Sequence, residues 1–131
     1  IWMFPEEIQK KMKTLMEKTK DHDQYVVNFA MAYGGRAEIL DAAKKIAEKI
    51  EKGELKASDV DEKVFEDNLY MVDKPEMIIR TSGERRTSGF LLWQSDYSEW
   101  FFVSKYWPEF EKEDFLKCIE EFKERKRRFG K

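Results

Sequence analysis

The chain contains 131 residues, of which 41% are hydrophobic and 40% are charged, and its formal net charge is −2. A chain of this length can build one domain with a hydrophobic core but is short for a complete α/β enzyme. The slightly negative charge argues against nucleic acid as a partner. Cys118 is the single cysteine, which excludes an intrachain disulfide and favours a reducing, cytoplasmic setting.

The first two predicted elements are a helix and a buried strand. Apolar residues recur at helical spacing over residues 6–20, with lysines and glutamates opposite, which predicts an amphipathic helix. A nearly continuous apolar run then extends from Tyr25 to Ala32 and ends at Gly34-Gly35. Such a run is typical of a buried parallel strand followed by its turn.

Two helices are predicted next along the chain. The first is strongly periodic and ends at Gly53, with its inward face formed by Ile39, Leu40, Ala43, Ile46, Ala47 and Ile50. Ser58 has the chemistry of an N-cap and predicts a shorter helix that ends near Asn68.

The C-terminal half contributes two more predicted strands and a last helix. Residues 77–79 and 100–103 are apolar or aromatic and predict strands. Residues 113–127 predict a helix whose inward residues are Phe115, Leu116, Cys118, Ile119 and Phe122. Strands that alternate with helices predict an α/β fold, a parallel sheet flanked by helices, in a single domain fragment over residues 1–131.

The segment between the last two strands carries the chemistry. The strand at residues 77–79 leads into a loop of small residues that holds Arg80, Arg85 and Arg86, and we expect a helical segment after it. Strand, small-residue loop and helix form ligand sites in α/β proteins. Paired arginines suit a phosphate or diphosphate. The alternative is that these are solvated arginines that form surface pairs with Glu84 or Asp96.

Four blocks of this sequence resemble the cis-prenyltransferase family, typified by undecaprenyl diphosphate synthase. Arg80-Thr-Ser-Gly-Glu84, Arg86-x-Ser88-x-Phe90-Leu-Leu-Trp-Gln94 and Tyr97-x-Glu99 together are similar to its isopentenyl-diphosphate motif. The other three blocks are Asn28-Phe-Ala-x-x-Tyr33-Gly-Gly-Arg36-x-Glu38-Ile39, Trp107-Pro-x-Phe110 and Arg127-Arg128-Phe129-Gly130. Their order is that of the family from about Asn28 to the C-terminus.

The resemblance implies the C-terminal part of the cis-prenyltransferase fold and a transferase. The family condenses isopentenyl diphosphate with an allylic diphosphate to make a cis-polyprenyl diphosphate, and this chain would supply the isopentenyl-diphosphate half-site. The family's N-terminal half, with a phosphate loop that holds the catalytic aspartate, is not found here. The chain also begins at Ile1. We therefore expect a portion of a longer enzyme that is inactive alone.

The resemblance also implies roles for individual residues. Arg80, Arg86 and Ser88 match positions that bind the diphosphate, and Thr87 between them would contribute its backbone N–H. Glu99 matches a ligand of Mg²⁺, although an isolated glutamate is more often a helix cap or a salt-bridge partner.

The basic C-terminus has two interpretations. Arg128-x-Gly130 resembles an element that reaches the active site of the neighbouring subunit, which implies a homodimer. The alternative is a cationic last turn that opposes the helix dipole.

Tyr33, Gly34 and Gly35 are expected to be scaffold around the site, together with Asn28 and Arg36. Trp93 is expected to tether the loop, and His22 to be exposed. Gly89 departs from the family, which commonly has asparagine there, so substrate positioning is expected to differ.

A second interpretation follows from the same resemblance. The alternative function is a non-catalytic partner subunit of the Nogo-B receptor type, which lacks the phosphate-loop aspartate. No apolar run reaches transmembrane length. Together with the single cysteine, this favours a cytoplasmic protein. If the substrate is a lipid, we expect the protein to meet it from water or from the membrane surface.

Overall fold

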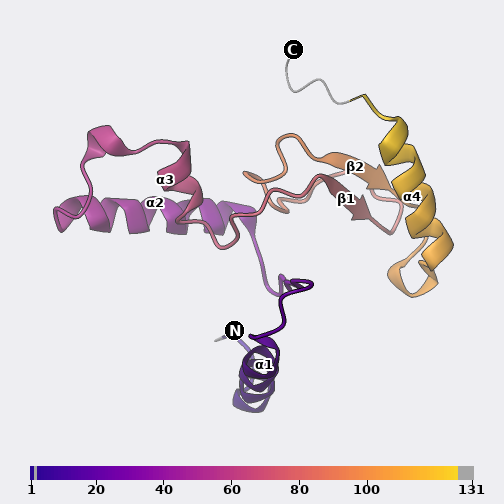
Figure 1. The fold of residues 1–131 in the computed structure, drawn as a ribbon, viewed down its shortest axis with the longest axis horizontal. Coiled ribbons are helices and arrows are strands. Elements are labelled where there is room, and N and C mark those ends of the chain that lie inside the picture. Colours follow the sequence, from indigo (N-terminus) through magenta and orange to yellow (C-terminus); the bar gives the residue numbers. More distant parts are fainter. Residues whose placement is uncertain (2, 127–131) are drawn as a thin grey trace. The chain divides into compact units, whose positions relative to one another are not determined.

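The computed structural model describes residue 1 and residues 3–126, and it divides into two compact units, Ile1–Tyr33 and Gly34–Lys131 (Figure 1). The expectation of a single domain fragment stays a prediction. Across the described residues, none of the helices is long and apolar enough to cross a membrane.

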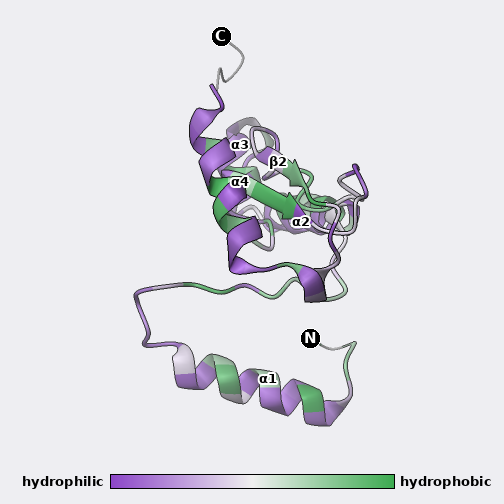
Figure 2. Cartoon of the chain, turned by 90° about the vertical axis from the view of Figure 1, so that its right-hand side faces the viewer, coloured by the Kyte–Doolittle hydropathy of each residue, from purple (hydrophilic) through white to green (hydrophobic). Residues whose placement is uncertain are grey.

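The first unit contains helix α1, Glu6–Thr19, which confirms the predicted amphipathic helix. Hydrophobic and hydrophilic segments alternate along it in Figure 2. The predicted strand from Tyr25 to Ala32 was wrong, because this segment is irregular and Tyr25 and Val26 are 85% and 81% exposed. A strand requires a neighbour for its backbone N–H and C=O groups. Within the described residues, no strand pairs with the segment from Tyr25 to Ala32.

The second unit begins with helix α2, Gly35–Glu51. The predicted end of this helix at Gly53 is confirmed, because Gly53 has a φ of 73° and donates its N–H to the carbonyl of Ile50. The buried face is rotated from the predicted one. Leu40 is 60% exposed, and the buried residues are Gly35, Glu38, Ala42 and Ile46.

Helix α3, Glu62–Glu66, packs beside α2 and follows a short 3₁₀ turn, η1, at Ala57–Asp59 (Figure 1). Its N-cap is Asp61, whose carboxylate accepts the N–H of Val64 at 2.8 Å. The predicted cap at Ser58 was wrong, because the Ser58 hydroxyl donates to the carboxylate of Asp59 at 2.9 Å.

Strands β1, Met77–Arg80, and β2, Glu99–Phe102, form a parallel pair and confirm the two predicted strands. Met77 lies opposite Glu99, and Arg80 lies opposite Phe102. The connection over residues 81–98 consists of turns, so the expected helical segment is absent. A positive φ of 45° at Leu91 is incompatible with a right-handed helix there.

Helix α4, Lys112–Glu124, lies beside the strand pair after a second 3₁₀ turn, η2, at Trp107–Glu109 (Figure 1). Phe122 contacts Phe101 of β2 with 6.5 Å between ring centroids, and Cys118 is buried as predicted. Phe115 and Leu116 are 42% and 44% exposed, so only part of the predicted inward face is covered. The α/β fold class, with a parallel strand pair and flanking helices, is confirmed.

Candidate functional site

Arg80, at the end of β1, brings the predicted anion-binding residues together. Its guanidinium Nη1 donates to the hydroxyl of Ser88 at 2.9 Å and to the backbone carbonyl of Arg86. Arg86 and Ser88, which follow Arg80 by six and eight positions, thereby both contact its guanidinium group. The described hydrogen bonds of Arg80 use Nη1 alone, and an arginine presents five N–H donors. The arrangement can therefore add an anion to the contacts already made.

The side chain of Arg86 has a different partner. Its Nη1 lies 2.6 Å from the carboxylate of Glu84, and both side chains are exposed. This is the surface pair that the sequence left open as an alternative for the loop arginines. Arg85 and Thr87 are also exposed, and the Thr87 carbonyl accepts the N–H of Phe90 at 3.0 Å. We call the exposed residues 83–88 the loop tip.

The backbone of this connection is strained at several positions. Ser82 donates its N–H to the carbonyl of Lys105 at 2.7 Å, which fixes the start of the loop against the segment that follows β2. A left-handed conformation at a non-glycine residue costs about 1 kcal/mol or more, and such strain concentrates at functional sites. Positive φ angles occur at the non-glycine residues Ser82 (85°), Ser88 (50°) and Leu91 (45°), and without strain at Gly83 (73°) and Gly89 (78°).

Residues 89–94, which we call the loop base, are held by three contacts, and the first is with Gly35. The N–H of Gly35 donates to the carbonyl of Gly89 at 3.0 Å. A Cβ at position 35 would lie 2.4 Å from that oxygen and 2.9 Å from Cγ of Leu92. The approach thus requires glycine at position 35, whereas a Cβ at Gly34 would meet nothing within 4 Å.

The second contact is a buried polar pair between Gln94 and Glu38 of α2. Gln94 is 1% exposed and Glu38 is fully buried. The Gln94 amide donates to the Glu38 carboxylate at 3.0 Å and to the carbonyl of Met71 at 2.9 Å. The N–H of Tyr70 donates to the same carboxylate oxygen at 2.9 Å. A buried charge is tolerated only when hydrogen bonds of this kind satisfy it, so the pair fixes the loop base against α2.

The third contact is made by Trp93, which tethers the loop as the sequence predicted. Trp93 contacts two residues of α3. Its indole N–H donates to the carboxylate of Glu66 at 3.2 Å, and its ring centroid lies 4.5 Å from that of Phe65. Lys74 also contacts Glu66. Hydrogen bonds from Lys74 and then from Trp93 lower the pKa of the Glu66 carboxyl. The charged form of Glu66 therefore supports the tether.

Glu99, the predicted metal ligand, makes an ion pair at the start of β2. Its Oε2 accepts from Nη1 of Arg125, the C-cap residue that follows α4, at 2.8 Å. The same nitrogen donates to the carbonyl of Trp100, and the guanidinium lies 4.0 Å from the ring centroid of Phe101. Hydrogen bonds to Glu121 and then to Glu99 raise the pKa of Arg125. The salt bridge foreseen as the alternative role of Glu99 is thus present.

The register of the strand pair separates Glu99 from the arginine loop. Glu99 lies opposite the first residue of β1 and Arg80 is the last, so the two positions differ by about 10 Å along the strands. Side chains alternate between the faces of a sheet, and paired residues share a face. Glu99 and Arg80 therefore project from opposite faces. The structure brings Arg80, Ser88 and the Arg86 backbone together and does not bring Glu99 to them.

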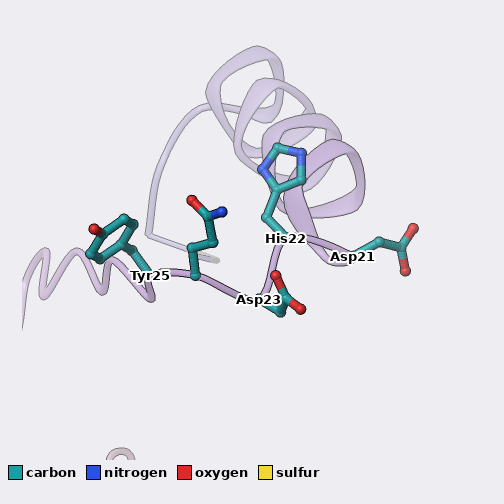
Figure 3. Close-up of a pocket in the computed structure, with 5 residues that line it drawn as sticks. Asp21, His22, Asp23 and Tyr25 are labelled. Atoms are coloured by element: carbon teal, nitrogen blue, oxygen red, sulfur yellow. The ribbon is translucent and has the colours of Figure 1, made fainter.

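A hollow of about 390 Å³ in the first unit carries no comparable chemistry. It is lined by residues 21–25, and in Figure 3 the side chains of Asp21, His22, Asp23 and Tyr25 diverge. His22 is exposed as expected. Burial raises the pKa of the Cys118 thiol, which fits a small buried hydrophobe better than a nucleophile. The described residues contain no cluster of three or more metal-ligating side chains.

Two predicted residues, Arg128 and Gly130, lie outside the described residues. Two others were missed by sequence reasoning as functional supports. Glu38 had a usable signal, because it precedes Ala42 and Ile46 at a spacing of four on one line of a helix, where a charge is unexpected. Arg125 offered only its spacing of four from Glu121, which is common on exposed helices.

Comparisons with known proteins agree with one another. A family model described as "Putative undecaprenyl diphosphate synthase" matches residues 1–130. A tritrans,polycis-undecaprenyl-diphosphate synthase (geranylgeranyl-diphosphate specific) of Methanocaldococcus jannaschii is 47% identical over 98% of this chain and 48% of its own length. An isoprenyl transferase of Thermotoga maritima is 48% identical over 97% of this chain and 54% of its own length.

A solved structure gives the same result for the fold. Lavandulyl diphosphate synthase from Lavandula x intermedia, in complex with dimethylallyl diphosphate, superposes with a TM-score of 0.93 and 35% identity. That match covers 98% of this chain and 56% of the plant protein. The chain spans about half the length of the curated relatives it matches.

Proposed function

Because this chain belongs to the undecaprenyl diphosphate synthase family of cis-prenyltransferases, we propose that it supplies the isopentenyl-diphosphate half-site of a polyprenyl diphosphate synthase. The reaction condenses isopentenyl diphosphate with an allylic diphosphate to make a cis-polyprenyl diphosphate. The observation that carries the proposal is the convergence of Ser88 and the Arg86 backbone on the guanidinium of Arg80. This chain alone is expected to be inactive.

The loop residues bind the diphosphate by exchanging partners. Arg80 offers the donors that its described contacts do not use, Ser88 offers its hydroxyl, and Thr87 offers its backbone N–H. Arg86 leaves Glu84 for the more highly charged diphosphate. An exposed ion pair contributes about 0–1 kcal/mol, so this exchange costs little compared with a charge-assisted bidentate contact.

Mg²⁺ belongs to the proposal as the cofactor that the family implies, and Glu99 is the carboxylate that the resemblance assigns to it. When bound, Mg²⁺ would neutralise charge on the diphosphates. A carboxylate oxygen suits this ion. The position of Glu99 does not suit the loop of its own chain, because Glu99 and Arg80 project from opposite faces at opposite ends of the strand pair. Glu99 and Arg80 of the described residues therefore do not lie around a single metal–diphosphate group.

Arg128 and Gly130 are assigned to substrate binding in a neighbouring subunit, so we propose a homodimer. We also propose a cytoplasmic protein that meets its lipid product at the membrane surface.

The test is a Mg²⁺-dependent elongation assay on the full-length protein with labelled isopentenyl diphosphate and an allylic primer. Arg86→Ala is expected to lower kcat/KM for isopentenyl diphosphate about 100-fold, since a lost charged contact costs about 1.5–3 kcal/mol. Arg85→Ala is the matched control and should retain activity. Absence of product from well-folded wild-type protein would favour the partner-subunit function instead.

A further inference from the structure

The start of the arginine loop is fixed against the segment that follows β2. The N–H of Val103 donates to the carbonyl of Arg80 at 2.8 Å, and the N–H of Gly83 donates to the carbonyl of Val103 at 2.9 Å. Between these two contacts, the N–H of Ser82 donates to the carbonyl of Lys105 at 2.7 Å. The backbone that follows β2 therefore sets the direction in which the chain leaves Arg80.

Ser82 depends on this contact for its conformation. Its φ of 85° lies in the left-handed region, which a residue with a side chain occupies only where its surroundings hold it there. The backbone partner of the Ser82 N–H is the Lys105 carbonyl. If that carbonyl moves, Ser82 can return to an ordinary φ, and the chain beyond it takes another direction. The position of Lys105 thus bears on where Arg86 and Ser88 lie relative to Arg80.

The side chain of Lys105 ties this segment to α4. Its Nζ donates to Oδ2 of Asp114 at 2.7 Å, and the same oxygen accepts the N–H of Glu111, the N-cap of α4, at 2.9 Å. The Asp114 side chain is only 12% exposed. The hydrogen bond to Asp114 raises the pKa of Lys105. Hydrogen bonds from Lys105 and then from the Glu111 N–H lower the pKa of the Asp114 carboxyl. Both groups are therefore charged at neutral pH, and their ion pair is anchored on a capped helix.

We propose that Lys105 and Asp114 are positioning residues for the isopentenyl-diphosphate loop. Their ion pair holds the backbone of Lys105 where its carbonyl meets the Ser82 N–H, and the loop is thereby presented to the diphosphate in one orientation. Neither side chain is assigned a contact with the substrate. The inference rests on the proposed function and extends it to two residues that follow the loop in the sequence.

The first test compares steady-state kinetics in the full-length protein. Lys105→Met removes the charge and keeps the length of the side chain. It should raise KM for isopentenyl diphosphate about fivefold, because a displaced loop loses contacts with this substrate. KM for the allylic primer should stay unchanged, since the family resemblance assigns that substrate to the N-terminal half. Lys112→Met, the same change at an exposed position on α4, is the matched control and should alter neither constant.

Two further variants test whether the ion pair acts as a unit. Lys105→Arg keeps the charge and should keep KM for isopentenyl diphosphate close to that of wild type. Asp114→Asn retains an oxygen for the Glu111 N–H, so α4 stays capped, and it should raise this KM as Lys105→Met does. The Lys105→Met/Asp114→Asn double variant should be no worse than either single variant, because each already removes the same ion pair. Additive effects would overturn the proposal.

Hydrogen exchange provides a readout that does not depend on turnover. Mass spectrometry of peptides that cover residues 80–83 should show the Ser82 amide exchanging at least about tenfold faster in Lys105→Met than in wild type, because its hydrogen bond is weakened. Lys112→Met should leave this exchange unchanged. Unchanged exchange in Lys105→Met would overturn the inference. An equal rise of both KM values together with a lower melting temperature would also overturn it, since the pair would then be merely structural.

The outcomes separate this inference from the proposed function. If Lys105→Met leaves KM for isopentenyl diphosphate unchanged while Arg86→Ala lowers kcat/KM, the loop function stands and the positioning inference fails. If Arg86→Ala leaves activity intact, the proposed function fails, and the positioning inference fails with it even where exchange at Ser82 responds.

Discussion

The loop tip and the loop base are adjacent in sequence but held in different ways. Every residue from 83 to 88 is exposed, and the Arg86 side chain has a single surface partner in Glu84. In the base, Gly89, Trp93 and Gln94 are each bonded to α2 or α3. The contrast indicates a division of labour. The base fixes where the loop lies, and the tip keeps its guanidinium groups able to change partners.

This division has an energetic logic. A binding loop must be positioned before the ligand arrives, because ordering it on binding would consume interaction energy. Its ligand-binding groups must also not be committed to strong contacts. Substitutions in the base should therefore act on stability, and substitutions in the tip should act on substrate binding alone.

The largest expected loss of stability comes from Gln94→Leu. It removes the amide that donates to the buried Glu38 carboxylate and to Met71. Loss of a partner to a buried charge should lower the free energy of unfolding by about 3 kcal/mol, measured by urea denaturation. Gln24→Leu, the same change at an exposed position, should alter it by less than about 0.5 kcal/mol. Equal effects at the two positions would contradict the buried-clamp interpretation.

Gly35→Ala should have the next largest effect. The new Cβ would lie 2.4 Å from the carbonyl oxygen of Gly89, so the backbone must move. Overpacking of this kind costs about 1–3 kcal/mol, measurable in the same denaturation experiment. Gly34→Ala is the matched control, because nothing lies within 4 Å of its Cβ and its φ of −144° suits any residue. A similar loss in both variants would rule out the close approach as the cause.

Glu66→Gln should produce a smaller, pH-dependent loss. The folded protein lowers the pKa of Glu66, so the contribution of its charged form is present above the unfolded pKa. That contribution is lost as pH falls through the lowered folded pKa. The variant should therefore melt below wild type at pH 7, and the difference should shrink in acid, as measured by calorimetry. Glu54→Gln, at an exposed position, is the control and should melt close to wild type at pH 7.

The smallest stability effect is expected for Arg86→Ala in the tip. Its exposed pair with Glu84 contributes little, so the free energy of unfolding should change by less than about 0.5 kcal/mol. The same variant is expected to lose isopentenyl-diphosphate turnover. A clear stability loss here, measured by urea denaturation, would mean that the tip is structural and would remove the contrast with the base.

Much of this fold could be predicted from local sequence patterns. Helices α1, α2 and α4 and strands β1 and β2 follow from apolar spacing and from Gly53 as a stop. The strand predicted from Tyr25 to Ala32 was wrong, because a hydrophobic run shows only that a segment could form a strand. A strand also needs a partner strand to pair with. The cap at Ser58 failed because Asp61 competes three residues later with a carboxylate that accepts the Val64 N–H.

The binding roles of the site residues stay predictions, but part of their arrangement follows from the sequence. The motif identified Arg80 and Ser88, and the structure brings them within hydrogen-bond distance. The separation of Glu99 from them depends on strand register, which no local pattern reveals. The support from Arg125 joins residues 26 positions apart and likewise depends on the tertiary structure.

Gly89 shows what kind of sequence variation the loop can accept. Its φ is 78°, yet a Cβ there would meet nothing within 4 Å, so conformation and not space restricts this position. Asparagine, which adopts positive φ more readily than other side-chain-bearing residues, satisfies the same restriction. In a saturation library the site should accept glycine and asparagine and deplete β-branched residues first. Position 35 should tolerate glycine alone. Gly35 and Gly89, although hydrogen-bonded to each other, would therefore differ in the substitutions that they accept.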